Sequence, residues 1–465
     1  MVKIGIFFYN YRYINGSIGF SYDVTGRDKR KEWQSMKPME KMQREKKHKK
    51  RKIRKFRVMA VTVVVSLVIL LGLGVVYLYN ENRPMYAGVV LPMEERDVIA
   101  TKTPEEWLAL EKELVMEVQP SVRLVMVGDM LMHLRVTQSG KMEDGTYNYD
   151  HIFEHVIEDI QDADLAIVNQ EIILGGPELG YSGYPMFNTA YELGDAIDKA
   201  GFDIVLHATN HTMDKGRTGL LNCLDYWSDN HPDIKVLGAN KTQEEYDEVY
   251  IYEQNDIKIA VLNYTYGLNG LPMPADMPYA VDMMDEDKMS ADIARAEAEA
   301  DFTVVCIHWG NEYQTYASAN QKMWSEFFLE RGVDLIIGTH PHVIQPVEWY
   351  EDENGHRMLV YYSIGNFINS TADSGNGIGA RVVGAMAEVE IIRDETGEVV
   401  IGDYGVTPLV TQIQAGPGNI TTYKLEDYSQ ELADSNQMSY KDPGFSYEFC
   451  KELCREVFGD LYIEE

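Results

Sequence analysis

The stretch between residues 302 and 342 sets the pattern for most of the chain. It begins with FTVVCIHWGNE (302–312), an apolar run that ends in histidine and glutamate. It closes with VDLIIGTHPH (333–342), a second apolar run that ends in two histidines, and a helix-like segment lies between the two at 318–331. A buried strand, a helix and a second buried strand form a βαβ unit, which indicates parallel strands. Polar residues that follow such strands gather at one edge of the sheet.

The same alternation of apolar runs and helix-like segments continues on both sides of this stretch. The runs expected to form buried strands are Arg123–Val127, Leu165–Val168, Ile204–Ala208, Ile257–Tyr264, Phe302–Ile307, Leu335–Ile337 and Met358–Tyr362. The helix-like segments between them lie near 149–161, 190–200, 216–229, 285–300 and 318–331. This order predicts an α/β domain with a largely parallel sheet.

The last part of the chain has a different pattern. Residues 385–392 and 399–409 are apolar and lack helical periodicity, so we expect them to close the domain as an antiparallel pair. We place the globular domain at 121–415. The remaining residues, 416–465, are predicted to form an acidic, tyrosine-rich tail with one short helix.

The charge of the chain is divided unevenly. The whole chain carries −32, yet residues 1–57 hold 18 Lys and Arg against 5 Asp and Glu. The rest of the chain holds 24 Lys and Arg against 69 Asp and Glu, a balance of −45. A polyanion of this size repels a nucleic-acid backbone, so we exclude nucleic acid as a partner.

An uncharged apolar stretch separates the basic part from the acidic part. Residues 58–80 (VMAVTVVVSLVILLGLGVVYLYN) have no charged side chain and are long enough to cross about 30 Å of hydrocarbon as a helix. Eleven Lys and Arg at 41–57 place the N-terminus in the cytoplasm. We therefore expect a single-pass cell-membrane protein with a cytoplasmic basic segment at 1–57. A stalk with a short helix would follow at 81–120 and carry an extracellular C-terminal domain.

Polar side chains follow nearly every expected strand. The residues at these ends are Asp129, His133, Glu171, Asn210, His211, His308, Glu312, His340, His342 and Asn366. Crowding so many titratable groups at one edge is costly, because burial and like charges oppose ionisation, and a divalent cation removes that cost. Imidazole, carboxylate and carboxamide ligands together suit Zn²⁺, Mn²⁺ or Fe²⁺. One bridging carboxylate with separate histidine sets fits two metals.

Six ordered blocks carry a family resemblance. They are GDMLMH (128–133), NQE (169–171), TNHTMDKG (209–216), IHWGNEY (307–313), GTHPHVIQP (338–346) and YSIGNF (362–367). In this order they resemble the CapA/PgsA poly-γ-glutamate capsule biosynthesis proteins, a family of the calcineurin-like metallophosphoesterase superfold. The resemblance covers about residues 121–412. It implies a four-layer αββα sandwich of two packed mixed sheets between helices.

The resemblance also implies roles for individual residues. Asp129 and Glu171 would be catalytic metal ligands, with Glu171 bridging the two metals, and His211 would protonate the leaving group. The further metal ligands would be His133, Asn210, His308, His340 and His342. Glu312, Gln345 and Asn366 would orient the ligands or the substrate.

Several other residues have a plainer interpretation. His207 lies inside an apolar run and is more typical of a core histidine than of a ligand. His151 and His155 are spaced like a helical metal pair, but we interpret them as part of a solvated helix face. Cys450 and Cys454 are four residues apart, where the spacing is compatible both with a disulfide and with two free thiols.

Two functions fit these observations. The first is a metal-dependent hydrolase of phosphoester type that acts in poly-γ-glutamate capsule or cell-envelope polymer biosynthesis. The second is a non-enzymatic accessory subunit that binds or exports the anionic polymer for a membrane-bound polyglutamate synthase. Both require divalent metal, because an acidic domain repels polyglutamate unless cations bridge the two.

Overall fold

The computed structural model describes residues 120–416 and 418–463. The basic segment predicted at 1–57 and the transmembrane helix predicted at 58–80 lie outside the described residues, as does all but the last residue of the predicted stalk. Among the helices that are described, none has both the length and the apolarity needed to cross a membrane.

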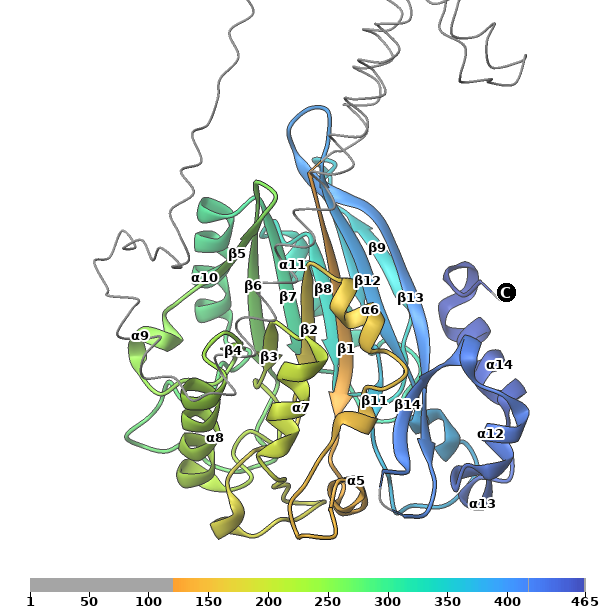
Figure 1. The fold of residues 1–465 in the computed structure, drawn as a ribbon. Coiled ribbons are helices and arrows are strands. Elements are labelled where there is room, and N and C mark those ends of the chain that lie inside the picture. The colour runs from red at the N-terminus through yellow and green to blue at the C-terminus, as the bar shows by residue number, and fades with distance from the viewer. Residues whose placement is uncertain (1–119, 417, 464–465) are drawn as a thin grey trace, which may run out of the picture. The chain divides into compact units, whose positions relative to one another are not determined.

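The first of two sheets is built around the start of the described chain (Figure 1). Its strands are β1 (Ser121–Met130), β2 (Leu165–Asn169), β3 (Ile204–Leu206), β4 (Lys235–Leu237), β11 (Asn366–Ile368), β12 (Val383–Arg393), β13 (Val399–Ile413) and β14 (Ile420–Lys424). They follow the order β14-β13-β12-β1-β2-β3-β4, and β11 pairs with β1 off this path. The pairs β1–β2, β2–β3, β3–β4 and β1–β11 are parallel, whereas β12, β13 and β14 are antiparallel to their neighbours.

The second sheet comes from the middle of the chain. Its strands are β5 (Tyr250–Gln254), β6 (Ile257–Thr265), β7 (Phe302–His308), β8 (Leu335–Thr339), β9 (Val347–Glu351) and β10 (Arg357–Tyr361), in the order β5-β6-β7-β8-β10-β9. The four central strands are parallel, and the two edge strands are antiparallel to their neighbours. The domain thus has two mixed sheets, as the family resemblance implies, instead of the single largely parallel sheet that the apolar runs suggest.

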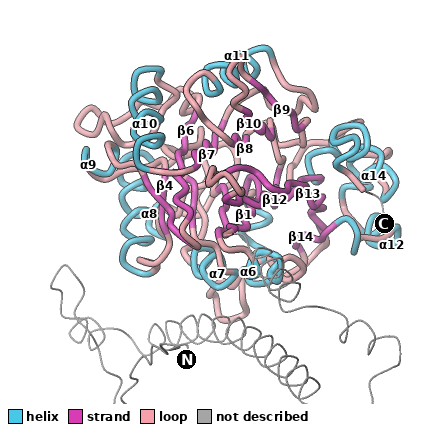
Figure 2. The backbone as a smooth tube through the Cα atoms, turned by 90° about the horizontal axis from the view of Figure 1, so that it is seen from above, coloured by secondary structure: helices cyan, strands magenta, loops and turns pink. Residues whose placement is uncertain are grey.

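The helices cover the outer faces of these two sheets. They are α5 (Leu134–Ser139), α6 (Ile157–Asp162), α7 (Glu192–Ala200), α8 (Gly216–Asn230), α9 (Gln243–Tyr246), α10 (Glu286–Glu299), α11 (Ala319–Leu329), α12 (Gln430–Ser435), α13 (Met438–Lys441) and α14 (Tyr447–Phe458). Figure 2 shows α6 and α7 outside the first sheet and α10 and α11 outside the second. One buried apolar cluster joins the inner faces of the two sheets, and two others join each sheet to its helices. The described domain therefore has the expected αββα layers.

Element type is predicted well where an apolar run is long. All seven expected strands and the antiparallel pair are present, with ends that differ by a few residues. The expected helix near 149–161 is broken, because only a 3-10 turn at Asp150–Ile152 and α6 form there. The strands β4, β5 and β9 are not predicted, because their residues are half-buried or exposed at sheet edges and form no continuous apolar run.

The expected C-terminal tail is instead part of the domain. Strand β14 extends the first sheet by pairing with β13 from Leu409–Lys424 to Ile413–Ile420. Three helices then follow rather than one, and Met438 and Cys450 are buried in the same cluster as the first sheet. The acidic composition hid an amphipathic pattern that buries one face of each element. Cys450 and Cys454 are both buried free thiols.

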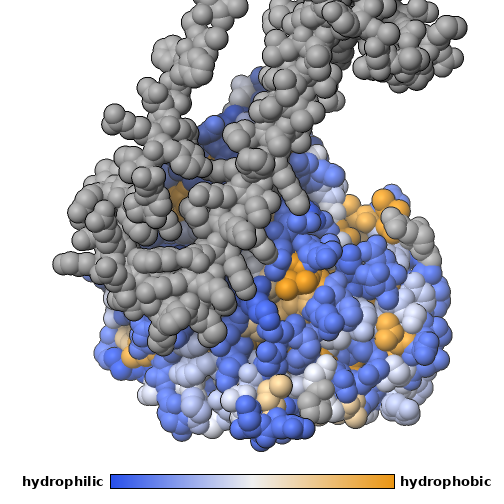
Figure 3. Space-filling model, viewed as in Figure 1, coloured by the Kyte–Doolittle hydropathy of each residue, from blue (hydrophilic) through white to orange (hydrophobic). Residues whose placement is uncertain are grey.

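The visible surface of the domain is mostly hydrophilic. On the part of the face that is visible in Figure 3, hydrophilic residues dominate and the apolar patches are small. Small apolar patches of this kind are usual on the surface of a globular domain.

Candidate metal centre

The centre begins where β1 comes closest to the segment that leads into β11. A Cβ atom on Gly128 would lie 1.9 Å from the carbonyl oxygen of Gly365, so only glycine allows this approach. The next residue, Asp129, donates its backbone N–H to the same oxygen at 3.0 Å. The contact places the Asp129 side chain at the end of β1 beside Asn366, its parallel partner in β11. Both side chains are buried.

Strand β2 delivers the second carboxylate. Asn169, its last residue, donates from Nδ2 to Oδ1 of Asp129 at 2.7 Å, which holds the two strand ends together. Glu171 follows two residues later and is fully buried. Neither carboxylate oxygen of Glu171 has a hydrogen-bond partner among the described residues. An orphaned buried carboxylate is costly, so it indicates a ligand site.

The two sheets meet at the centre through Asn210 and His308. Asn210 follows β3 of the first sheet, and His308 is the last residue of β7 in the second. Nε2 of His308 lies 3.0 Å from Oδ1 of Asn210 and 3.7 Å from Oε1 of Glu171. On the other side of the ring, Nδ1 lies 3.0 Å from the Thr339 hydroxyl, which fixes the ring orientation.

The turn after β8 adds two more imidazoles. His340 and His342 both have left-handed backbone conformations, with φ of 93° and 59°. Such strain in residues other than glycine is concentrated at functional sites. Nδ1 of His342 lies 3.1 Å from Oδ2 of Asp129, and its Nε2 lies 3.5 Å from Oε1 of Glu171. Nδ1 of His340 is buried and has no partner among the described residues.

Burial and proximity shift the proton affinities of these groups. Burial raises the pKa of Glu171 well above its usual value and lowers that of His308 and His340 well below theirs. Burial alone would also lower the pKa of His342, but Glu171 and Asp129 raise it to about 9. Burial therefore keeps the imidazoles of His308 and His340 neutral, the form that binds metal, whereas Asp129 and Glu171 favour a protonated His342, which must lose that proton to bind a cation.

These residues fit a divalent cation. One donor atom each from Glu171, His340 and His342 lies within 4.8 Å of the others, and all three side chains are buried. The two unpartnered oxygens of Glu171 and the unpartnered Nδ1 of His340 are the atoms that a cation would satisfy. The mixed nitrogen and oxygen set suits a transition metal rather than Ca²⁺.

His211 lies next to the Glu171 carboxylate. Its Nε2 is 4.0 Å from Oε1 of Glu171, and its Nδ1 is 2.8 Å from Oδ2 of Asp214. The backbone N–H of Phe187 donates to the same Asp214 oxygen at 2.6 Å, and the Phe187 ring packs edge-on against His211. A buried carboxylate on Nδ1 fixes the imidazole so that Nε2 faces the centre.

A small hollow opens on the centre. Leu131, His133, Tyr184, Phe187, His211, Glu312, Tyr313, His342, Asn366, Asn369, Thr371 and Arg381 line it. His133, expected as a metal ligand, is half-buried at its wall, and its Nδ1 is 3.3 Å from the Leu131 carbonyl. Burial lowers the His133 pKa to about 4. The expected orienting residue Glu312 is exposed at the hollow.

Gln345, expected to orient a ligand or the substrate, lies elsewhere. Its Oε1 accepts from Gln321 at 2.8 Å, and its Nε2 donates to the carbonyls of Gln314 and Tyr316. The buried amide therefore holds the loop before α11 in place. Asn366, by contrast, contacts an expected metal ligand, because its Oδ1 is 3.1 Å from Nδ1 of His342.

This geometry can be compared with known proteins. The family model described as "Bacterial capsule synthesis protein PGA_cap" matches residues 123–371, which include every residue of the centre. The chain belongs to the PGA_cap family. It is 26% identical to "Capsule biosynthesis protein CapA" of Bacillus anthracis over 298 residues, which are 62% of this chain and 69% of that protein. It is 27% identical to "PGA biosynthesis protein CapA" of Bacillus subtilis (strain 168) over 248 residues, 52% of this chain and 59% of that protein.

Solved structures that resemble this PGA_cap domain are more distant. A hypothetical protein from Thermus thermophilus has a TM-score of 0.36 at 15% identity and is covered over 97% of its chain, against 62% of this one. The NAD nucleotidase NadN of Haemophilus influenzae has a TM-score of 0.41 at 11% identity, with 74% of this chain and 65% of that one covered. At TM-scores below 0.5 neither likeness decides anything about the site.

Of the histidines assigned plainer roles, His207 is placed as expected, whereas His151 and His155 are half-buried and do not lie on one helix face, because His151 is in a 3-10 turn and His155 precedes α6. His207 is buried with Nε2 3.5 Å from the Cys223 sulfur, and burial lowers its pKa to about 3, so it is a core histidine. His151 lies 3.1 Å from the Ser139 hydroxyl, whereas His155 stacks on Tyr423. The latter two rings have separate partners and do not form a metal pair.

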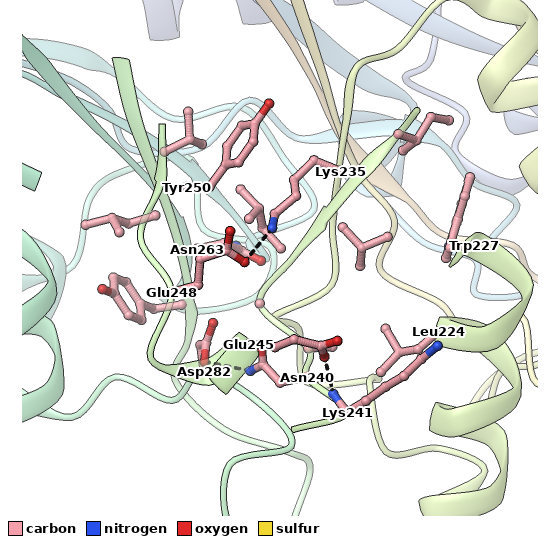
Figure 4. A pocket seen from close by; sticks show the side chains of 18 of the residues that line it. Leu224, Trp227, Lys235, Asn240, Lys241, Glu245, Glu248, Tyr250, Asn263 and Asp282 are labelled. Carbon is pink, nitrogen blue, oxygen red and sulfur yellow. Dashed lines mark hydrogen bonds and ion pairs between the residues drawn. The ribbon is translucent and has the colours of Figure 1, made fainter. Parts of the chain in front are cut away.

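A larger cavity of about 320 Å³ lies away from the centre, between the edge strand β4 and strand β6. Figure 4 shows its charged side chains pointing toward one another. Lys235 pairs with Glu248 at 2.8 Å, and Lys241 pairs with Asp225 at 2.7 Å. Deeper in the wall, Lys288 binds the Asp292 carboxylate. The lysines of this cavity are thus paired with carboxylates of the protein, whereas the Glu171 carboxylate has no lysine or arginine partner among the described residues.

Three contributors to the site have no assigned role in the sequence prediction. Asp214 is in the TNHTMDKG block, three residues after His211, and that spacing is a signal for a pair on one turn. Asn169 is in the NQE block. Arg381 lies in no block, and only the three-dimensional fold brings it to the hollow.

Proposed function

We propose that this PGA_cap protein is a membrane-anchored, extracytoplasmic, metal-dependent hydrolase in the synthesis of a poly-γ-glutamate capsule or a related envelope polymer. The observation that carries the proposal is the orphaned Glu171 carboxylate among buried imidazoles, with His211 held opposite by Asp214. The names of the Bacillus relatives support a role in capsule synthesis. We place the anchor at residues 58–80.

The residues divide the work of a hydrolysis between them. Asp129, Glu171, Asn210, His308, His340 and His342 would hold one or two Zn²⁺, Mn²⁺ or Fe²⁺ ions, with His133 at the wall as a further candidate. The bound cation would polarise the scissile phosphoester or amide and activate water. His211 then donates a proton from Nε2 to the leaving group, while Asp214 stabilises the charged imidazole.

A second function is supported by the lining of the hollow. The cation Arg381 and the aromatic ring of Tyr313 lie at the same hollow as His342, where they could contact an anionic chain that passes over it. On this view the protein is an accessory of a membrane-bound polyglutamate synthase, and metal at Glu171 binds polymer carboxylates without cleaving anything. The two functions share the centre and differ only in turnover.

The test uses the full-length chain purified in detergent. Metal content is measured first, and turnover is then assayed against phosphomonoesters, phosphodiesters and γ-glutamyl peptides. His211→Gln should slow substrates with poor leaving groups by about 10² to 10⁴, but have little effect on a p-nitrophenyl ester, which needs no proton. His356→Gln is the matched control, because the half-buried ring of this histidine contacts the Val333 carbonyl and none of the proposed ligands.

The results separate the two functions. Turnover that depends on His211 in this leaving-group-selective way supports the hydrolase. Metal-dependent binding of polyglutamate without turnover of any substrate supports the accessory. A full-length chain that binds no divalent metal contradicts both.

A further inference from the structure

Three cations from distant parts of the sequence lie near one another, and one of them, Arg381, lines the hollow. Arg135 is in α5, Arg381 is in the 3-10 turn at Ile378–Val382, and Lys441 is the last residue of α13. We call these three residues the basic strip. All three side chains are half-buried, in a chain whose overall charge is −32.

Hydrogen bonds connect the members of the basic strip. Lys441 donates from Nζ to the carbonyl of Thr371, and Arg381 donates from Nη1 to the hydroxyl of the same residue at 3.3 Å. Arg135 donates to the Gln437 side chain, in the residue just before α13. After burial, the charge of Arg135 is the main cause that lowers the Lys441 pKa. The strip therefore runs from the hollow toward α5 and α13, on the lower side of the molecule in Figure 1.

Two members of the strip, Arg135 and Lys441, lack the ion-pair partners that other half-buried cations have. Lys424 pairs with Asp159 at 3.6 Å and with Glu426 at 2.9 Å. Among residues 120–416 and 418–463, by contrast, no carboxylate forms an ion pair with Arg135 or Lys441. Two like charges that are close together and partly desolvated destabilise each other, and an external anion relieves that cost.

Arg381 joins the strip to the hollow. Its guanidinium stacks on the Tyr313 ring, 3.5 Å from the centroid, and pairs through Nη1 with Asp373 at 2.7 Å. The hydrogen bonds of this guanidinium within the described chain use Nη1 only, which leaves Nε and Nη2 for a ligand. Arg381 and the metal-site residue His342 line the same hollow. An anionic group bound by Arg381 thus lies next to the centre.

We propose that the basic strip binds successive carboxylates of an anionic polymer and brings one of them to Arg381, beside the hollow. The assignment rests on the proposed function, because it takes the polymer to be the ligand of the Glu171 centre. It adds the polymer's route across the surface. A carboxylate chain can bind to the strip despite the negative charge of the domain, because Arg135 and Lys441 have no ion-pair partner and attract it locally, while distant charges are screened by salt.

The test is the binding of a fluorescein-labelled γ-linked oligoglutamate of about ten residues to the metal-loaded, full-length chain, followed by anisotropy. The double variant Arg135→Gln/Lys441→Gln should weaken binding at least ~10-fold, since two charge-assisted contacts are lost. The charge-matched control Lys322→Gln/Arg295→Gln changes exposed cations on α11 and α10 and should stay within ~2-fold. Lys441→Arg keeps the charge and should keep the affinity.

Metal content and the thermal unfolding midpoint identify a variant that has simply failed to fold, and Lys441→Glu then serves as the replacement. An equal loss in the α10–α11 control would mean non-specific attraction and would overturn the proposal. So would unchanged affinity in the double variant, or strip-dependent binding of polyphosphate with none of oligoglutamate. Failure here is distinguishable from failure of the hydrolase, because the anisotropy measurement requires no turnover.

Discussion

The metal centre and the cavity between β4 and β6 differ in whether a buried carboxylate has hydrogen-bond partners within the chain. In the cavity, Asp292 accepts two hydrogen bonds from Lys288, at 2.6 and 2.7 Å, and a third from the Tyr264 hydroxyl at 2.8 Å. In the centre, both oxygens of Glu171 are buried without a partner in the described chain. Asp292 is therefore neutralised by the chain itself. Glu171 is left for a ligand, and burial without neutralisation distinguishes a binding site from a structural ion pair.

The largest effect should come from removing the unpaired carboxylate. Glu171→Ala deletes the central ligand, so metal affinity should fall by at least ~100-fold and turnover with it. Elemental analysis of the purified chain, together with the assay of the proposed function, measures both. Glu248→Gln at the cavity is the control, because Glu248 is exposed and its partner Lys235 lies away from the centre. Full metal content in Glu171→Ala would refute the assignment of the centre.

Replacing the acid by its amide should change the free energy of unfolding in opposite directions at Asp292 and at Glu171 once metal is removed. With a chelator present, Asp292→Asn should lower the free energy of unfolding by about 3 kcal/mol, because Lys288 loses its buried partner. Glu171→Gln should raise it by about 1 kcal/mol, because the amide has no ionised form for burial to destabilise, whereas burial raises the pKa of the Glu171 carboxyl well above its usual value. Denaturant titrations of the three proteins at neutral pH compare them directly.

Adding metal provides the control for the variants Asp292→Asn and Glu171→Gln. Adding saturating Zn²⁺ or Mn²⁺ should stabilise the natural chain by about 2.7 kcal/mol at a hundredfold excess over Kd, and Asn at 292 should not alter that increment. Glu171→Gln should lose most of it. If both variants destabilise the metal-free chain equally, the two carboxylates do not differ as the structure indicates.

The sequence predicts the fold well because the buried strands are continuous apolar runs. Runs such as 302–307 and 335–337 lie in buried strands of the second sheet, where sequence pattern and structure agree. The pattern fails at 416–465, where polar and tyrosine-rich residues hide β14 and two of the three helices. There the packing against β13 decides the structure, and a single sequence does not contain that information.

The site shows the same division. The proposed ligands Asp129, Glu171 and His308 lie at or just after the ends of strands and are recognisable in the sequence, because parallel strand ends converge. Gln345 was expected near the substrate, but the fold turns its amide toward the loop before α11. Arg381 is not recognisable, since nothing in its own sequence places it beside a hollow formed by residues from distant parts of the chain.

A moderate effect should come from the carboxylate that orients His211. Asp214→Asn keeps the shape of the side chain but removes the charge that stabilises a protonated imidazole, so turnover should fall by about 10- to 100-fold. Metal content should stay near that of the natural chain, because Asp214 contacts His211 and the backbone of Phe187 instead of a proposed ligand. Asp195→Asn is the control and should leave turnover unchanged. Asp195 lies on α7 and pairs with His231. Equal losses in the two variants would argue against an orienting role.

The smallest effect is on stability and concerns His231. Like Asp292, this residue is buried beside oppositely charged partners from the chain itself. It is 8% exposed, and Nε2 lies 2.9 Å from Asp195 and from the Tyr226 hydroxyl, while Nδ1 lies 3.4 Å from Asp198. Burial would lower its pKa, but the two carboxylates raise it from 6.5 to about 9. A raised pKa means that the folded state holds the proton more tightly. The added stability is thus complete below pH 6.5 and is lost as the pH rises through 9.

The measurement that checks this pH dependence is the free energy of unfolding at several pH values. His231→Gln should cost about 1–2 kcal/mol at pH 6, discounted because Asp195 is 61% exposed, and the difference from the natural chain should shrink toward pH 10. His207→Gln is the control, because burial lowers the His207 pKa to about 3 and the ring stays neutral over the whole range. Its cost should therefore not change between pH 6 and 10. A flat difference for His231→Gln as well would mean that Asp195 and Asp198 do not hold a charged imidazole, and that self-neutralised pairing is confined to the β4–β6 cavity.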